Sequence, residues 1–135
     1  MITEAQIVLF RFPQTDQTEV KLRPALVLRR LPGHYNDWMI CMISSQLHQQ
    51  IPDFDEVITF SDSDFYQSGL KLASVIRISR LAVVNSDMLL GKLGQIDTLR
   101  LSRIKQRLAS WIQKTCQITR IFWIINDLLV LPQIK

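Results

Sequence analysis

The segment KLRPALVLRR, residues 21–30, decides how the fold is organised. Its centre, residues 25–28, is a run of four apolar residues that suits a buried strand. Arg23 and Pro24 stand immediately before this run. Because proline lacks an amide hydrogen and favours extended backbone in the residue before it, the pair suits the first residues of a strand. The sequence therefore predicts a core strand over residues 24–30 that opens at a permanently charged guanidinium.

Further apolar runs of strand length lie on both sides of this segment. Gly91 and Gly94 in the last of them predict a bend or a bulge. The nearly continuous apolar run at 38–44 predicts a central strand that is buried on both faces. Since no helical pattern separates the runs, they predict a compact β-barrel or sandwich. The runs cover residues 6–12, 38–44, 56–60, 72–78, 81–84 and 88–96.

The hydrophobic period changes after residue 96. Asp97 can cap a helix, and Ile96 and Leu101 have the spacing of a hydrophobic staple. The same 3-4 spacing continues to Leu129, although β-branched residues weaken a helical interpretation there. The sequence predicts a domain over residues 1–115 with a C-terminal helix, and an apolar extension over residues 116–135 that either continues this helix or forms a second element. The apolar stripe of the predicted helix comprises Leu101, Ile104, Leu108, Trp111 and Ile112.

Composition indicates a globular domain with an uneven distribution of charge. The chain has 135 residues, of which 47% are hydrophobic and 21% charged, and its net charge is +4. Residues 53–64 hold five acids and no base, whereas residues 71–120 hold ten bases and two acids. A basic half favours a polyanion or an acidic protein as partner. For Asp53, Asp55 and Glu56 we expect a solvated acidic loop.

Several classes of chemistry lack their sequence motifs. The chain has no glycine-rich nucleotide loop and no metal-ligand spacing, so no cofactor and no metal site are predicted. Cys41 and Cys116 stand in apolar contexts and are expected to be buried, reduced thiols, while His34 and His48 are expected in solvated loops. The N-terminus has no signal-peptide pattern, and polar residues interrupt the apolar run at 121–131. We therefore expect a cytoplasmic protein without a membrane span.

Arginines and hydroxyls at strand ends remain as candidates for chemistry. Arg23 precedes the second strand, the third strand closes on Ser44, and Arg77 interrupts the apolar run of the fifth. Each alone is explained by solvent exposure at a strand end or edge. Together they are the ingredients of a phosphate site that uses no metal, because guanidinium groups bind an oxyanion and hydroxyls orient it.

The order of several sequence blocks resembles the PemK/MazF family of toxins from bacterial toxin–antitoxin pairs. These blocks are IVLFRFPQTDQ, KLRPALVL, CMISSQ, SGLKLASVIR and LGKLGQI, followed by a basic helix, and the likeness covers residues 5–112. The resemblance implies a mainly β (α+β) fold, a small SH3-like β-barrel with a C-terminal α-helix. It further implies a homodimer that cleaves single-stranded RNA without a metal and is silenced by an acidic antitoxin. DNA would be contacted only through the antitoxin complex.

The resemblance also implies roles for individual residues. Arg23 matches the active-site arginine, Ser44 the serine or threonine that ends the third strand, and Arg77 an arginine that acts as acid and anion stabiliser. These three are the predicted catalytic residues. The predicted RNA-binding residues are Lys21, Ser45, Gln46, Lys71, Ser79 and Arg80.

Two departures from the family pattern keep a second function open. Ser79 stands where some members have an acid, and the first loop contains no histidine. Arginine and unassisted serine are poor general bases. The alternative is a non-catalytic module of the same fold that binds RNA or antitoxin, or acts on gyrase as related gyrase poisons do. The apolar spacing over 118–131 gives an additional reason to expect a dimer.

Overall fold

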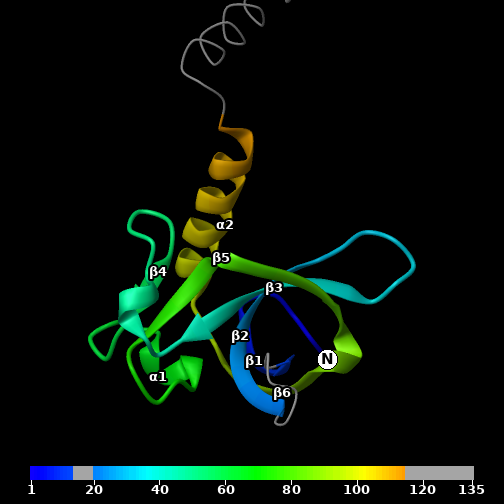
Figure 1. The fold of residues 1–135 in the computed structure, drawn as a ribbon, viewed down its shortest axis with the longest axis horizontal. Helices are drawn as coiled ribbons and strands as arrows, with labels where there is room; N and C mark the ends of the chain where they lie inside the picture. The colour runs from blue at the N-terminus through cyan, green and yellow to red at the C-terminus, as the bar shows by residue number, and fades with distance from the viewer. Residues whose placement is uncertain (14–19, 115–135) are drawn as a thin grey trace, which may run out of the picture.

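The computed structural model describes residues 1–13 and 20–114 (Figure 1). The strands are β1 (Gln6–Pro13), β2 (Val20–Arg30), β3 (Asp37–Ser44), β4 (Glu56–Ile58), β5 (Ser74–Asn85) and β6 (Leu89–Gln95). The helices are α1 (Phe65–Ser68) and α2 (Thr98–Gln113), with short 3₁₀ turns η1 (Leu47–Gln49) and η2 (Ser86–Met88). Within these residues no helix is long and apolar enough to cross a membrane. The predicted extension over 116–135, which includes Cys116, lies outside the described residues.

The strands form one antiparallel sheet in the order β4-β5-β3-β2-β1-β6. Figure 1 shows the sheet curling on itself, with α2 rising from one side and the β2–β3 connection extending away from β4 and α1. The predicted mainly β fold with a C-terminal helix is confirmed. The described strands do not close the sheet by hydrogen bonds, because β4 and β6 remain its two edges.

Two strand predictions need correction. β2 begins at Val20 rather than at residue 24, so Arg23 lies inside the strand, opposite Phe10 of β1. Pro24 is tolerated there because, among the described strands, β2 pairs only with β1 until Ala25 meets β3. The runs at 72–78 and 81–84 are one strand, since an irregularity of the β3–β5 register between Arg77 and Leu81 lets β5 bend without ending.

The predictions for β3 and β6 are confirmed. β3 is flanked by β2 and β5 and has a largely buried body. The pairing of β6 with β1 shifts register beside both Gly91 and Gly94. At Gly94 a Cβ atom would lie 2.1 Å from the Gln67 carbonyl oxygen, so glycine is required where α1 and β6 approach each other.

The sheet has an apolar cluster on each face. The helix-side cluster includes Leu26, Cys41 and Ile76 of the sheet and Leu101, Ile104 and Leu108 of α2. The opposite cluster comprises Val8, Phe10, Ala25, Val27, Trp38, Ile40 and Leu89. Cys41 is buried as predicted, and burial, followed by the charge of Asp55, raises the pKa of its thiol far above the ordinary range.

Helix α2 begins where the sequence predicts. The Asp97 side chain accepts a hydrogen bond of 2.7 Å from the Arg100 amide, as an N-cap does. The predicted apolar stripe is buried at Leu101, Ile104 and Leu108, but Trp111 and Ile112 are exposed. Figure 1 shows α2 pointing away from the sheet toward its C-terminal end, where Trp111 packs against Phe54 with ring centroids 5.7 Å apart.

The acidic segment is not a solvated loop, and this expectation was wrong for two of its three residues. Asp53 is exposed, but Asp55 and Glu56 keep only 2% and 7% of their surface. Arg100 of α2, itself 5% exposed, pairs with Glu56 at 2.8 Å and with Asp64 at 2.8 Å. The acidic run and the basic helix therefore neutralise each other within the molecule.

Arg100 binds Asp64 through a bidentate contact, from Nε to Oδ2 (2.8 Å) and from Nη2 to Oδ1 (3.1 Å). Burial alone would raise the pKa of Asp64, but the hydrogen bonds from Arg100 and from the Asp97 amide, together with the arginine charge, lower it overall. The buried carboxylate is therefore ionised, and it joins α2 to the segment before α1.

Candidate active site

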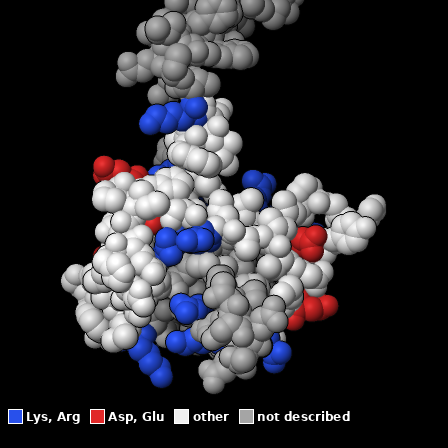
Figure 2. All heavy atoms as spheres, in the orientation of Figure 1, with Lys and Arg blue, Asp and Glu red and all other residues white. Residues whose placement is uncertain are grey.

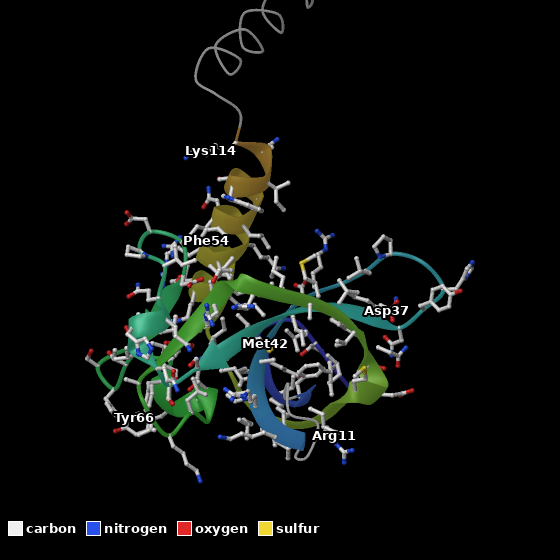
Figure 3. The ribbon with its side chains drawn as sticks, viewed as in Figure 1. Arg11, Asp37, Met42, Phe54, Tyr66 and Lys114 are labelled. Atoms are coloured by element: carbon white, nitrogen blue, oxygen red, sulfur yellow. The ribbon has the colours of Figure 1, made fainter. Side chains whose placement is uncertain are left out.

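Three neighbouring strands bring the predicted catalytic residues to one face of the sheet. Ala25 of β2 pairs with Met42 of β3, and Met42 pairs with Arg77 of β5. Residues that lie opposite each other on adjacent strands share a face, so these three form a row across the sheet. Figure 3 shows Met42 in the middle of this region, where β2, β3 and β5 run side by side.

Arg23 and Ser44 belong to the next row on the same face. Each lies two residues from the Ala25–Met42 pair, and a two-residue step returns a side chain to the same face. Extending the register by these two residues puts Arg23 opposite Ser44. Because neighbouring strands are about 4.8 Å apart, the backbones at Arg23 and Arg77 are separated by roughly 10 Å across the sheet. Both arginines are half-buried residues on this face, as is Ser44.

A chain of hydrogen bonds connects Arg77 to Ser44. Arg77 Nη1 donates to Gln49 Oε1 (3.3 Å), and Gln49 Nε2 donates to Gln46 Oε1 (3.0 Å). The backbone amide of Gln46 in turn donates to Ser44 Oγ (3.1 Å). The hydroxyl oxygen of Ser44 is the acceptor in this bond, so its proton can be donated to another group. Sequence reasoning selected Gln46 but missed Gln49, because glutamines in a polar loop carry no spacing signal.

The rest of the Arg77 guanidinium is not used by the described protein. Arg77 Nε is buried without a hydrogen-bond partner, and no described carboxylate forms an ion pair with this side chain. Buried donors without a partner are uncommon and costly in folded proteins. Among the described residues, the guanidinium of Arg77 therefore keeps hydrogen-bonding capacity that its one contact with Gln49 does not use.

Asp55 connects the bend of β5 after Arg77 to the loop that carries Gln49. Its carboxylate accepts hydrogen bonds from the amide and the hydroxyl of Ser79, each at 3.0 Å, and from the Ile51 amide at 2.9 Å. Ser79 belongs to the bend of β5, and Ile51 belongs to the loop that carries Gln49. The hydroxyl of Ser79, predicted to bind RNA, therefore already binds a buried carboxylate.

The other predicted RNA-binding residues are exposed. Lys21 lies on β2, two residues before Arg23, and Arg80 lies in the bend of β5. Lys71 precedes β5 at the end of the sheet where β3 finishes. In the view of Figure 2, basic side chains lie near the middle of the molecule and acidic ones mostly toward its margins. The remaining two, Ser45 and Gln46, directly follow β3.

Neither histidine lies on the strands that carry Arg23, Ser44 and Arg77. His34 is exposed in the β2–β3 connection and His48 is exposed in η1, as expected from the sequence. Nowhere in residues 1–13 and 20–114 do three or more His, Cys, Asp or Glu side chains gather as a possible metal site. The chemistry that this arrangement offers is therefore anion binding by two guanidinium groups and a hydroxyl.

The sequence matches one family profile over most of its length. Residues 3–112 match the PemK-like, MazF-like toxins of type II toxin–antitoxin systems. No curated protein gives a significant match.

Solved structures with a similar fold include the Mycobacterium tuberculosis toxin MazF-mt6, with a TM-score of 0.59, 14% identity, and coverage of 82% of this chain and 98% of that chain. A mycobacterial endoribonuclease in complex with its cognate antitoxin has a TM-score of 0.60 and 13% identity, with coverage of 85% of this chain and 98% of that chain. MazF from Deinococcus radiodurans has a TM-score of 0.58 and 20% identity, with coverage of 82% of this chain and 96% of that chain. These likenesses support the fold, and the profile match supplies the family. The chain therefore belongs to the PemK-like, MazF-like toxins of type II toxin–antitoxin systems.

Proposed function

We propose that this toxin is a metal-independent, sequence-selective endoribonuclease that cleaves single-stranded RNA. The observation that carries the proposal is the common face of Arg23, Ser44 and Arg77 on three adjacent strands. Two guanidinium groups beside a hydroxyl form a site for a phosphodiester, whose charge rises in the transition state. Similarity to a mycobacterial endoribonuclease adds support.

In the proposed reaction the ribose 2′-oxygen attacks the adjacent phosphorus. The bond from O2′ to phosphorus forms while the bond from phosphorus to O5′ breaks, which yields a 2′,3′-cyclic phosphate and a free 5′-hydroxyl. The proton of the 2′-hydroxyl passes to solvent water, and solvent water returns a proton to O5′, so the step is balanced in protons. Arg23 and Arg77 stabilise the pentavalent phosphorane, and Ser44 donates a hydrogen bond that orients a non-bridging oxygen. Both guanidinium groups act by binding and offsetting the charge of the phosphate and are not assigned the role of general base.

The surrounding residues would hold the RNA strand and set its sequence preference. Lys21, Lys71 and Arg80 are exposed cations that can contact neighbouring phosphates, and Ser45 and Gln46 can reach base edges. The Ser79 hydroxyl donates a hydrogen bond to Asp55. We therefore assign Ser79 a role in shaping the bend of β5 beside the bound RNA.

We also propose that the toxin works as a cytoplasmic homodimer and is silenced by an acidic antitoxin. Arg29 and Arg30 are exposed and, among the described residues, form no ion pair. Together with Ile2, Glu4 and Trp38 they line an open hollow on the surface. The similar mycobacterial endoribonuclease is in complex with its cognate antitoxin. An acidic segment with apolar side chains would suit this hollow.

The test is cleavage of defined single-stranded RNA in excess chelator. We expect site-selective cuts with cyclic phosphate and 5′-hydroxyl ends, lost in Arg77→Ala and retained in Arg29→Ala, a matched arginine of β2 outside the site. Activity that appears only when magnesium is restored would refute the metal-independent mechanism. RNA binding without any cleavage would instead support the binding-module alternative.

A further inference from the structure

Gln49 is the one described residue that contacts the Arg77 side chain through a hydrogen bond. It lies in η1, in the loop after β3, and it also donates to Gln46. We propose that Gln49 is a positioning residue: it fixes the guanidinium of Arg77 so that the Nε and Nη2 edge faces the phosphate. This inference rests on the proposed endoribonuclease function and adds a residue to its machinery.

The hydrogen bonds determine the orientation of the Gln49 amide. Arginine only donates hydrogen bonds, so the amide oxygen of Gln49 must face Arg77 and its nitrogen must face away. The nitrogen then meets Gln46 Oε1, an acceptor, at 3.0 Å. Rotating the amide by 180° would oppose donor to donor at Arg77 and acceptor to acceptor at Gln46. Both neighbours therefore select the same orientation, and Gln49 holds Arg77 by a defined contact.

The contact leaves one bidentate edge of Arg77 without a hydrogen-bond partner among the described residues. Gln49 engages Nη1, so the edge that remains is formed by Nε and Nη2. Nε is buried without a partner, and Nη2 donates to no described residue. Arg100 uses this same pair of nitrogens to bind both oxygens of Asp64, at 2.8 and 3.1 Å. A phosphate presents two oxygens in a similar way and would be bound by Arg77 as Asp64 is bound by Arg100.

A neutral side chain suits this position better than an acid. A carboxylate in place of Gln49 would accept the same hydrogen bond, but its negative charge would offset the charge that Arg77 brings to the phosphate. The amide orients the guanidinium and leaves its full positive charge for the substrate. If Gln49 only stabilised the loop away from Arg77, a carboxylate at this position would not change the charge that Arg77 offers to the phosphate, whereas a positioning residue beside Arg77 must be neutral to preserve that charge.

The loop that presents Gln49 is itself anchored. The Ile51 amide donates to the buried Asp55 carboxylate at 2.9 Å, and Arg107 of α2 donates to the carbonyl oxygens of Phe54 and Asp55 at 3.1 and 3.4 Å. Figure 3 shows Phe54 beside α2. Gln49 is therefore held from both the sheet and the helix, as a positioning residue requires.

The experiment compares Gln49→Leu, Gln49→Glu and the control His48→Ala, an exposed neighbour in the same turn. We expect Gln49→Leu to lower kcat about 10- to 100-fold, the effect of losing one hydrogen bond to a charged group, with a smaller change in KM. His48→Ala should cleave at the wild-type rate. In an Arg77→Ala background Gln49→Leu should cause no further loss, because a residue that acts through Arg77 has nothing left to position. Gln49→Glu should keep the protein folded but weaken RNA binding.

A second measurement does not depend on activity. Side-chain nitrogen NMR of the full chain, with the Arg77 signals identified by their absence in Arg77→Lys, reports how freely the guanidinium rotates. We expect restricted rotation in the wild type and faster rotation in Gln49→Leu. An unchanged kcat in a folded Gln49→Leu variant, additive losses with Arg77→Ala, or equal rotation in both proteins would overturn the inference. Absence of cleavage by the wild type would refute the proposed function, whereas the rotation measurement would still decide whether Gln49 fixes Arg77.

Discussion

Replacement of Arg100 by methionine should destabilise the fold more than replacement of any exposed cation. Its guanidinium is 5% exposed and contacts Glu56, Asp64 and the Val57 carbonyl oxygen. Burial lowers the pKa of Arg100, but the charges and hydrogen bonds of Asp64 and Glu56 outweigh it and raise the pKa, so this group remains charged. Methionine has a similar length and fills most of the space, so the substitution mainly removes the charge and the hydrogen bonds.

The expected cost follows from the two carboxylates that remain. Asp64 and Glu56 are 2% and 7% exposed, and neither can recover its lost contact from water without opening the structure. Removing one partner of a buried ion pair costs about 3–5 kcal/mol. For a chain of 135 residues each kcal/mol lowers Tm by roughly 3–5 °C, so the midpoint should fall by at least about 9 °C.

Arg103→Met is the matched control. Arg103 lies one turn further along α2 and donates to the same Glu56 oxygen, but its side chain is 54% exposed. An exposed ion pair contributes about 1 kcal/mol or less, so this variant should melt within a few degrees of the wild type. Thermal melts at pH 7 in low and high salt measure both. If the two variants lose equal stability, or Arg100→Met loses less than about 1 kcal/mol, the buried cluster does not hold α2 as argued.

Four further predictions follow from contacts described above. Arg23→Lys should cleave RNA about 10²–10³-fold more slowly than wild type, close to Arg23→Ala, because lysine lacks the planar fork; cleavage at the wild-type rate would remove Arg23 from the site. Since the folded pKa of Asp64 is lowered, its contribution to stability is present above about pH 4 and is lost as the pH falls further. In urea melts the Asp64→Asn variant should have a lower free energy of unfolding than the wild type at pH 7, and should lose less of it as the pH falls below about 4. In a Cys116→Ser variant, Cys41 should resist thiol reagents at pH 8 until the protein is unfolded. Gly94→Ala should cost at least about 1–3 kcal/mol in denaturant melts, because the added methyl group meets backbone atoms.

Local patterns in the sequence predicted the elements that depend on local chemistry. The apolar run at 38–44 identified the central strand, and Asp97 identified the start of α2, because neither depends on a distant part of the chain. Gly91 and Gly94 indicated the bulges of β6 for the same reason. Arg23, Ser44 and Arg77 were selected as residue types at strand ends, but their common face depends on the register of three strands.

Features that depend on distant partners could not be predicted. Glu56 was expected to be a solvated acid because the arginine that neutralises it lies 44 residues further along the chain. The length of β5 was underestimated because the bend after Arg77 interrupts the alternation of its side chains. Gln49 was missed since only the folded loop brings it to Arg77.

The position of β1 has a consequence for synthesis of the toxin. β1 is translated before the other described strands, yet it lies between β2 and β6, where Ile7 pairs with Gly94. The helix-side cluster also needs Leu101, Ile104 and Leu108, which are translated later still. A nascent chain therefore cannot complete its sheet or its core until α2 has left the exit tunnel. On the proposed function, the toxin would therefore stay inactive during translation until both β6 and α2 have been made.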